Sequence, residues 1–176
     1  GQLDLRKLSG VAFMKGWGIV GIAMFVGCLN LAGFPIITAG YWSKDMILGE
    51  AFANPHTQAI GWILLLTAGL TAYYTFRAYY LTFHGELRVP AEAGDHAHES
   101  PPVMTFPLLV LATGALIVGI AVEPFNHAFS HFLGHTPSLQ QAAASAGAKD
   151  VEHGFNWGIA GLSTLLALGG LSLAHR

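Results

Sequence analysis

The chain has 176 residues, of which 53% are hydrophobic and only 10% are charged, and its formal net charge is −2. Soluble domains carry about 25% charged residues, so this composition, with a mean hydropathy of +0.51, indicates a polytopic membrane protein. The charge balance excludes the basic surface that nucleic acid requires. The single cysteine, Cys28, excludes an internal disulfide and a cysteine-ligated iron–sulfur cluster.

The chain opens at Gly1 in a polar segment, without an initiator methionine or a signal peptide. Four apolar runs follow, separated by polar loops, and they predict an all-α, polytopic transmembrane helix bundle with one discontinuous helix. We therefore expect residues 1–176 to form a single transmembrane region that is a fragment of a larger subunit.

The first apolar run, about residues 16–53, predicts the discontinuous helix. A helix needs about 20 apolar residues to cross a bilayer, so this run is too long for one straight helix and too short for a hairpin of two. Pro35 disfavours helical geometry at the residue before it, while Gly33 and Gly40 loosen the chain on either side. We expect a break over residues 33–40, which membrane proteins tolerate only beside protein or a water-filled cavity.

Three further apolar runs predict straight membrane helices at about residues 57–83, 101–122 and 155–174. Four crossings place the polar segments alternately on the two sides of the membrane. One side would carry five of the basic residues in these segments and the other side only Lys149, so the positive-inside tendency makes the first side cytoplasmic. The five residues are Arg6, Lys7, Lys15, Arg88 and Arg176.

Lys44 and Asp45 are the only charged residues between positions 16 and 48. A charge inside a bilayer costs roughly 2.5–3.5 kcal/mol on insertion scales, so it persists only when it is paired or faces protein or water. One interpretation is an anchoring pair at a helix end, with the lysine reaching toward the headgroups. The other is a proton or ion relay, in which poor solvation opposes the charge of a lysine and a neighbouring carboxylate supports it.

Arg77 and His84 lie seven residues apart near the end of the second run, two helical turns along one face. The arginine can be an anchor that reaches the cytoplasmic headgroups. Alternatively, the two residues form the cytoplasmic mouth of a proton path, because histidine titrates near neutral pH and can pass protons on.

Three histidines in the longest loop, His127, His131 and His135, would share one face of a helix and form the strongest candidate for a zinc site. No cysteine or carboxylate is interleaved with them, and Gly134 weakens the helix at the third. We therefore expect a solvated loop helix and no metal site. Because the sequence has no phosphate-binding glycine loop and no Ser/His/Asp pattern, we expect no cofactor site either.

Several short runs within about the first 125 residues match one family of membrane proteins in the same order. The most specific surround the predicted break and read LAGFP at 31–35 and AGYWSKD at 39–45. The others are DLRKLSG at 4–10, YTFR at 74–77, LTFHG at 81–85 and HESPPVM at 98–104. Together they resemble the antiporter-like subunit family of proton-translocating NADH:quinone oxidoreductase (respiratory complex I), and within it the C-terminal part of subunit L, or chain 5. Residues 126–176 match only in hydropathy.

Two positions depart from the family pattern. Ile36 stands where the family often has a second proline, and Met46 stands where it often has a glutamate. The family's N-terminal helices, with their glutamate and central lysine, have no counterpart in this sequence, so we expect a chain of this extent not to pump protons alone.

The resemblance implies that Lys44 and Asp45 belong to the outlet half of a proton channel on the non-cytoplasmic side, and that Arg77 occupies a motif position. His84 would then join the proton path. The resemblance implies no redox centre or cofactor in this chain; NADH, FMN, iron–sulfur clusters and quinone would be bound by partner subunits. The expected partners are the other membrane and peripheral subunits of complex I and the lipid of a bacterial inner membrane.

Two alternatives stay open at this point. The chain could belong to a related cation/proton antiporter or a membrane-bound hydrogenase, which share the broken helix and its lysine. It could also be an accessory or assembly membrane protein that keeps the fold without transport, and tolerance of an uncharged residue at Lys44 would favour that reading.

Overall fold

The computed structural model describes residues 7, 9–13, 18–53, 55–89, 98–122, 135 and 156–175. The regular structure in these residues is helical, which confirms the predicted all-α class, and one isolated β-bridge joins Ser9 to Arg88. In chain order, the helices are the short 3₁₀ helix η2 (Val11–Phe13) and the α-helices α1 (Gly18–Ala32), α2 (Ala39–Ala53), α3 (Gln58–Phe83), α4 (Pro102–Val122) and α7 (Trp157–Ala174).

Three of these helices, α3, α4 and α7, are long and apolar enough to cross a membrane. By contrast, α1 and α2 have 15 residues each, which makes each about 22 Å long against roughly 30 Å of hydrocarbon. The first apolar run therefore forms two consecutive short helices, and the broken helix that the sequence predicted is confirmed. That the chain crosses the membrane at the four expected places stays a prediction.

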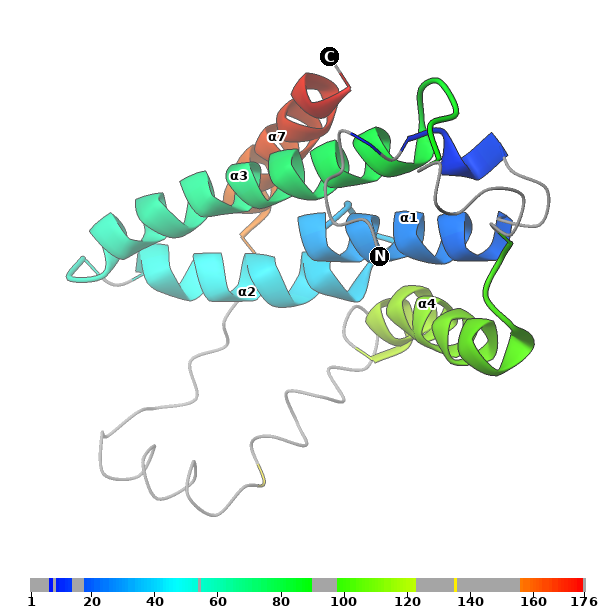
Figure 1. Cartoon of the computed structure of the whole chain (residues 1–176). Helices are drawn as coiled ribbons and strands as arrows, with labels where there is room; N and C mark the ends of the chain where they lie inside the picture. The colour runs from blue at the N-terminus through cyan, green and yellow to red at the C-terminus, as the bar shows by residue number, and fades with distance from the viewer. Residues whose placement is uncertain are drawn as a thin grey trace.

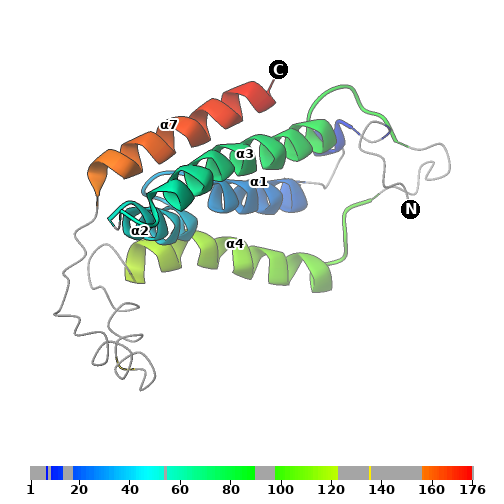
Figure 2. The same cartoon turned by 90° about the vertical axis from the view of Figure 1, so that its left-hand side faces the viewer.

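The two short helices run one after the other along α3, in the opposite direction (Figure 1). Near the start of α1, Gly21 lies against Phe83 at the end of α3. Near the end of α2, the ring of Phe52 meets that of Trp62 edge-on, close to the start of α3. α1 and α2 also pack against α4, and α7 packs against α3. Figure 2 shows the resulting order of layers: α7, α3, the α1–α2 pair and α4.

Small residues allow α7 to approach α3 closely. Gly170 lies so near the backbone of Gly69 that an added Cβ would come within 2.7 Å of the Gly69 carbonyl oxygen. Further along, the side chain of Arg77 reaches the carbonyl of Ala174 at the end of α7. These contacts show that α3 and α7 run parallel, so their C-terminal ends lie at the same end of the bundle.

The core lies where α3 faces α1 and α7. Phe76 and Ala72 of α3 are fully buried there, and the ring of Phe25 from α1 packs edge-on against Phe76 at a centroid distance of 6.2 Å. Large apolar side chains are exposed on the outer faces of α4 and α7, for example Val103 at 84% and Leu165 at 69%. Exposure on this scale suits a surface that faces lipid or a neighbouring protein rather than water.

The end of α1 is built as a Schellman motif. Gly33 has a φ of 74°, its amide donates to the carbonyl of Asn30 at 3.1 Å, and the next amide donates to the carbonyl of Leu29 at 2.9 Å. The last four carbonyls of a helix have no intrahelical partner. The motif satisfies two of them and leaves the carbonyls of Leu31 and Ala32 to find other donors.

Within the break, Ile36 adopts a φ of 69°, a left-handed conformation that β-branched residues rarely adopt. The indole Nε1 of Trp42 donates to the carbonyl of Ile36 at 3.2 Å and so helps to hold this turn. The ring of proline fixes φ near −65°. The turn in this chain is therefore closed to the second proline that the resembling family often has at this position.

Candidate functional site

Lys44 lies in the second turn of α2, and its side chain reaches back across the break to α1. The ammonium Nζ donates to the carbonyls of Leu31 at 3.0 Å and Ala32 at 3.2 Å. These are the two terminal carbonyls that the Schellman motif leaves without an amide partner. The cation therefore completes the cap of α1 and lies at the negative end of the helix dipole.

Asp45 extends instead toward α7. Its side chain is largely buried, with the residue only 5% exposed, and its Oδ1 accepts a hydrogen bond of 2.6 Å from the hydroxyl of Ser163. The other carboxyl oxygen, Oδ2, is buried and has no hydrogen-bond partner in the described part of the chain. A buried polar atom without a partner is costly, so Oδ2 is suited to take up a proton or a polar ligand.

Lys44 and Asp45 do not pair directly, because no ion pair within 4.0 Å joins these two described residues. Adjacent residues on a helix do not face each other, and here each charge has its own partner helix. The structure thus brings the two predicted residues into one region, where the side chain of Lys44 contacts the end of α1 and that of Asp45 contacts the middle of α7.

A second polar contact joins α2 to α7 one turn before Asp45. The side chain of Tyr41 is buried, with the residue 5% exposed, and its hydroxyl shares a hydrogen bond with the side chain of Thr164. Residues four apart on a helix lie on one face, so Tyr41 and Asp45 present two polar groups to α7. Their partners on α7 are two consecutive hydroxyl side chains, those of Ser163 and Thr164.

Glycines allow the backbone to pack closely around the break. The amide of Gly40 donates to Oδ1 of Asn30 at 2.9 Å, and a Cβ on Gly40 would collide with the carbonyl oxygen of Asn30. From α4, Gly119 also lies close against the backbone of Thr38 and Ala39, and a Cβ there would collide with the amide of Ala39. The position of Lys44 and Asp45 is therefore fixed by backbone contacts from both α1 and α4.

The other end of α1 meets a carboxylate. Oε1 of Glu99, from the segment before α4, accepts a hydrogen bond of 3.0 Å from the amide of Val20. Val20 is one of the first residues of α1, whose amides have no intrahelical partner, and a negative charge is favourable there. Each end of α1 is therefore contacted by a charge of the sign that the helix dipole favours: the negative Glu99 at the N-terminus and the positive Lys44 at the C-terminus.

Arg77 and His84 lie together at the end of the bundle where α3 and α7 finish. Both line a cleft of about 540 Å³ between the two helices and the turn that follows α3. The guanidinium of Arg77 donates to the carbonyl of Ala174 at 3.4 Å. The ring of His84 lies 5.4 Å from the rings of Tyr79 and Tyr80. The structure thus brings this second predicted pair together.

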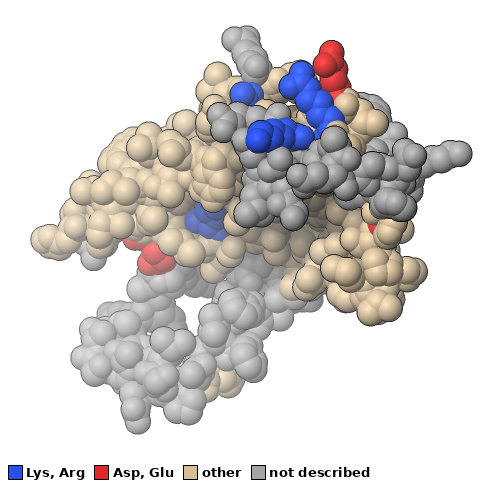
Figure 3. Space-filling model, in the orientation of Figure 1, with Lys and Arg blue, Asp and Glu red and all other residues tan. Residues whose placement is uncertain are grey.

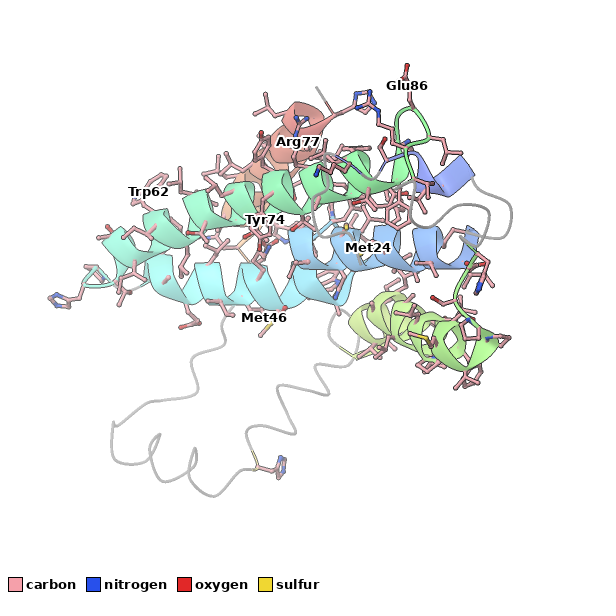
Figure 4. All side chains as sticks on the ribbon, viewed as in Figure 1. Met24, Met46, Trp62, Tyr74, Arg77 and Glu86 are labelled. Atoms are coloured by element: carbon pink, nitrogen blue, oxygen red, sulfur yellow. The ribbon has the colours of Figure 1, made fainter. Side chains whose placement is uncertain are left out.

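Basic residues dominate the lining of this cleft. Arg88 and His175 also line it, and among the described residues Glu86 is its only acidic lining residue. Arg88 and Glu86 form an ion pair at 3.4 Å whose side chains are 62% and 87% exposed, and such exposed pairs contribute little stability. Figure 3 shows basic side chains gathered at this end beside an acidic one, and Figure 4 labels Arg77 and Glu86 there.

The structure does not bring the two predicted sets into one site. Asp45 bonds to Ser163 and Arg77 bonds to Ala174, and both partners belong to α7. At 1.5 Å per residue, positions 163 and 174 are about 16 Å apart along the helix axis. Any transfer of charge between the two sets would therefore need intermediate groups.

Ser163, Thr164 and Glu99 were not among the residues predicted for the site. Ser163 and Thr164 are the only two adjacent hydroxyl residues in a mostly apolar helix, which is the signal that could have pointed to them. Two of the three loop histidines, His127 and His131, lie outside the described residues, so the absence of a metal site there stays a prediction. Within the described residues, no group of three possible metal ligands occurs.

Comparison with known proteins gives the family of this chain. No family model matches it. Chain 5 of the NAD(P)H-quinone oxidoreductase of Picosynechococcus is 38% identical over 97% of this chain and 26% of that protein. Subunit L of the NADH-quinone oxidoreductase of Rhodobacter capsulatus is 44% identical over 57% of this chain and 14% of that protein.

A third relative supports the same family. Chain 5 of the NADH-ubiquinone oxidoreductase of Metridium senile is 35% identical over 73% of this chain and 21% of that protein. The chain thus spans about a quarter or less of the length of each of these relatives. Over most of its own length, it is homologous to subunit 5, or L, of the NAD(P)H-quinone oxidoreductases.

Proposed function

We propose that this chain is part of a proton-translocating membrane subunit of an NADH:quinone oxidoreductase and contains the outlet half of a proton channel. The subunit lies in a bacterial inner membrane, and the other membrane and peripheral subunits of the complex carry out NADH oxidation and quinone reduction. In this proposal FMN, iron–sulfur clusters and quinone are bound by those partners, and the present chain carries protons only. The homology with subunit 5/L supports the choice of complex.

The observation that carries the proposal is the arrangement at the break. The ammonium group of Lys44 lies on the open C-terminal end of the short helix α1, and the next residue, Asp45, has a buried carboxyl with one oxygen unsatisfied. Charges within the apolar part of a membrane bundle are costly and are typical of ion paths. The ammonium of Lys44 can release a proton, and the free oxygen of Asp45 can accept one.

Arg77 and His84 take a separate role in this proposal, at the cytoplasmic mouth of the path. Their cleft is open to the surface and basic, and an imidazole exchanges protons readily near neutral pH. The guanidinium of Arg77 keeps its proton in proteins, so it would act as a fixed charge while His84 exchanges protons.

The test uses the full-length subunit in the assembled complex. Lys44→Ala and Asp45→Asn should each lower the number of protons taken up per NADH oxidised in membrane vesicles, while the complex still assembles on native gels. Asparagine can still accept the hydrogen bond of Ser163 but cannot carry a proton, so it separates chemistry from packing. Met46→Leu, at the exposed neighbouring position, is the control. Normal pumping by both variants would refute the proposal.

The cap geometry also favours a second candidate, a membrane protein that keeps this fold without transport. In that case Lys44 serves only to satisfy the carbonyls of Leu31 and Ala32. Loss of the lysine would then reduce assembly in proportion to the lost hydrogen bonds, and whatever complex still formed would pump normally. Measuring assembly and pumping in the same preparation distinguishes the two candidates. Co-purification with NADH-oxidising activity separates both from a cation/proton antiporter.

A further inference from the structure

Ser163 is a buried hydroxyl that faces the one buried carboxyl group in the described part of the chain. It is 6% exposed, and its Oγ lies 2.6 Å from Oδ1 of Asp45 and 3.4 Å from the carbonyl oxygen of Ala160. Serine in a helix commonly bonds to a carbonyl of its own preceding turn. Here the shorter contact is the one to Asp45 of α2, so the hydroxyl donates its hydrogen bond to Asp45.

We propose that Ser163 is a positioning residue of the proton path: it holds the carboxyl of Asp45 by Oδ1 and leaves Oδ2 as the oxygen that exchanges protons. This inference rests on the proposed role of Asp45. A hydroxyl can donate to Oδ1 whether Oδ2 is ionised or protonated. The hydrogen bond therefore persists in both charge states and keeps the carboxyl in one orientation through the cycle.

The neighbouring contact fixes the register of α7 against α2. Tyr41 and Thr164 bond one turn away from Asp45 and Ser163. The two contacts use consecutive residues of α7 and residues four apart on α2, so a shift of either helix by one residue would break both. The rest of α7 near them is apolar and would not oppose such a shift. The contact of Thr164 therefore helps to place Ser163 opposite Asp45, and Ser163 in turn orients the carboxyl group of Asp45.

A purely structural role for Ser163 makes a different prediction from a positioning role. If the hydroxyl only fills space, a residue of the same shape without a hydroxyl should serve equally well. If it orients Asp45, the hydroxyl itself is required and the shape is secondary. Threonine and valine have nearly the same shape and differ in the hydroxyl, so they form a matched pair at this position.

The experiment compares Ser163→Ala, Ser163→Thr and Ser163→Val in the full-length subunit within the assembled complex. Ser172→Ala is the control, because Ser172 is exposed on the same helix and bonds only to the carbonyl of Gly169, at 2.8 Å, in the described part of the chain. We expect alanine and valine to cause a loss of protons pumped per NADH oxidised, threonine to restore pumping, and Ser172→Ala to change nothing.

Infrared difference spectra give a readout that a structural role would not move. The carbonyl stretch of protonated Asp45 is identified by its loss in Asp45→Asn. It should shift to higher frequency in Ser163→Ala and Ser163→Val, because a carbonyl vibrates at lower frequency when it accepts a hydrogen bond. It should stay in place in Ser163→Thr and Ser172→Ala.

Two results would overturn the inference in different ways. If Asp45→Asn pumps normally, the proposed function fails and the inference fails with it. If Asp45→Asn abolishes pumping but Ser163→Val pumps like Ser163→Thr, or the carbonyl band does not move, then Asp45 is in the path and Ser163 is not its positioning residue. Should Ser163→Ala fail to assemble, the threonine and valine pair still decides.

Discussion

The break between α1 and α2 and the cleft at the end of α3 and α7 contain the same type of contact in different surroundings. In each, a basic side chain donates to carbonyls at the C-terminus of another helix, where a positive charge is favourable. Lys44 makes two such bonds, at 3.0 and 3.2 Å, across the break between α1 and α2, whereas Arg77 makes a single bond of 3.4 Å in an open cleft; both side chains are half-buried.

The difference lies in what surrounds each cation. Beside Lys44 is Asp45, buried and with one oxygen unsatisfied. Beside Arg77 are exposed groups that water can reach, including the Arg88–Glu86 pair. Capping a helix alone does not require a buried carboxyl nearby. In the proposed function the cation at the break has a second role besides capping, and the predictions below probe how far the two regions differ.

The largest expected effect is on the backbone of the break. Gly40→Ala would drive a Cβ into the carbonyl of Asn30, and neither backbone can yield without moving α1 against α2. We expect a destabilisation of about 3 kcal/mol, at the upper end of overpacking effects, and loss of assembly on native gels. Gly49→Ala is the matched control in the same helix, because nothing lies within 4 Å of its Cβ position. If Gly40→Ala assembles as well as Gly49→Ala, the packing at the break is wrong.

A smaller effect is expected at the start of α1. Glu99→Gln keeps an acceptor for the amide of Val20 but removes the charge at the positive end of the helix. We expect a loss of about 0.5–1 kcal/mol in stability against thermal unfolding of the purified complex. Glu86→Gln, at a side chain 87% exposed, should have no measurable effect. Equal effects from the two substitutions would show that the charge of Glu99 does not stabilise α1.

The smallest effect is expected in the cleft. Arg77→Lys keeps the positive charge near the carbonyl of Ala174, and Arg77→Ala removes one long hydrogen bond in a partly solvated place. We expect a loss of at most about 0.5 kcal/mol for alanine and less for lysine, with pumping reduced less than by Lys44→Ala. A loss of pumping in Arg77→Ala as large as that in Lys44→Ala would remove the distinction between the two regions.

The position of the break could be predicted from the sequence because its causes are local. Pro35 and Gly33 act through their own backbone conformations, whereas Gly40 lies inside α2 and acts through its close contact with Asn30. Lys44 and Asp45 could be singled out because charges are rare in an apolar run. Arg77 and His84 could be paired because seven residues along a helix return to the same face.

The partners of these residues could not be predicted, because they come from elsewhere in the chain. Ser163 is 118 residues from Asp45, and hydroxyl side chains in apolar helices often bond to their own preceding turn, as Thr67 and Thr71 do in α3. The target of Lys44 depends on which two carbonyls the Schellman motif leaves open. The sequence suggested a Lys44–Asp45 pair because it shows that the two residues are adjacent but not in which direction each side chain points.

The measurement that tests the account most directly is proton uptake per NADH oxidised in vesicles that contain the complex with Lys44→Arg. Arginine has five donors and can cap the carbonyls of Leu31 and Ala32 as lysine does, but it does not release its proton in proteins. If Lys44 carries protons, the variant should assemble normally and pump no better than Lys44→Ala. If Lys44→Arg assembles and pumps like the unaltered complex, Lys44 is a helix cap and the proton-transfer role of the break is contradicted.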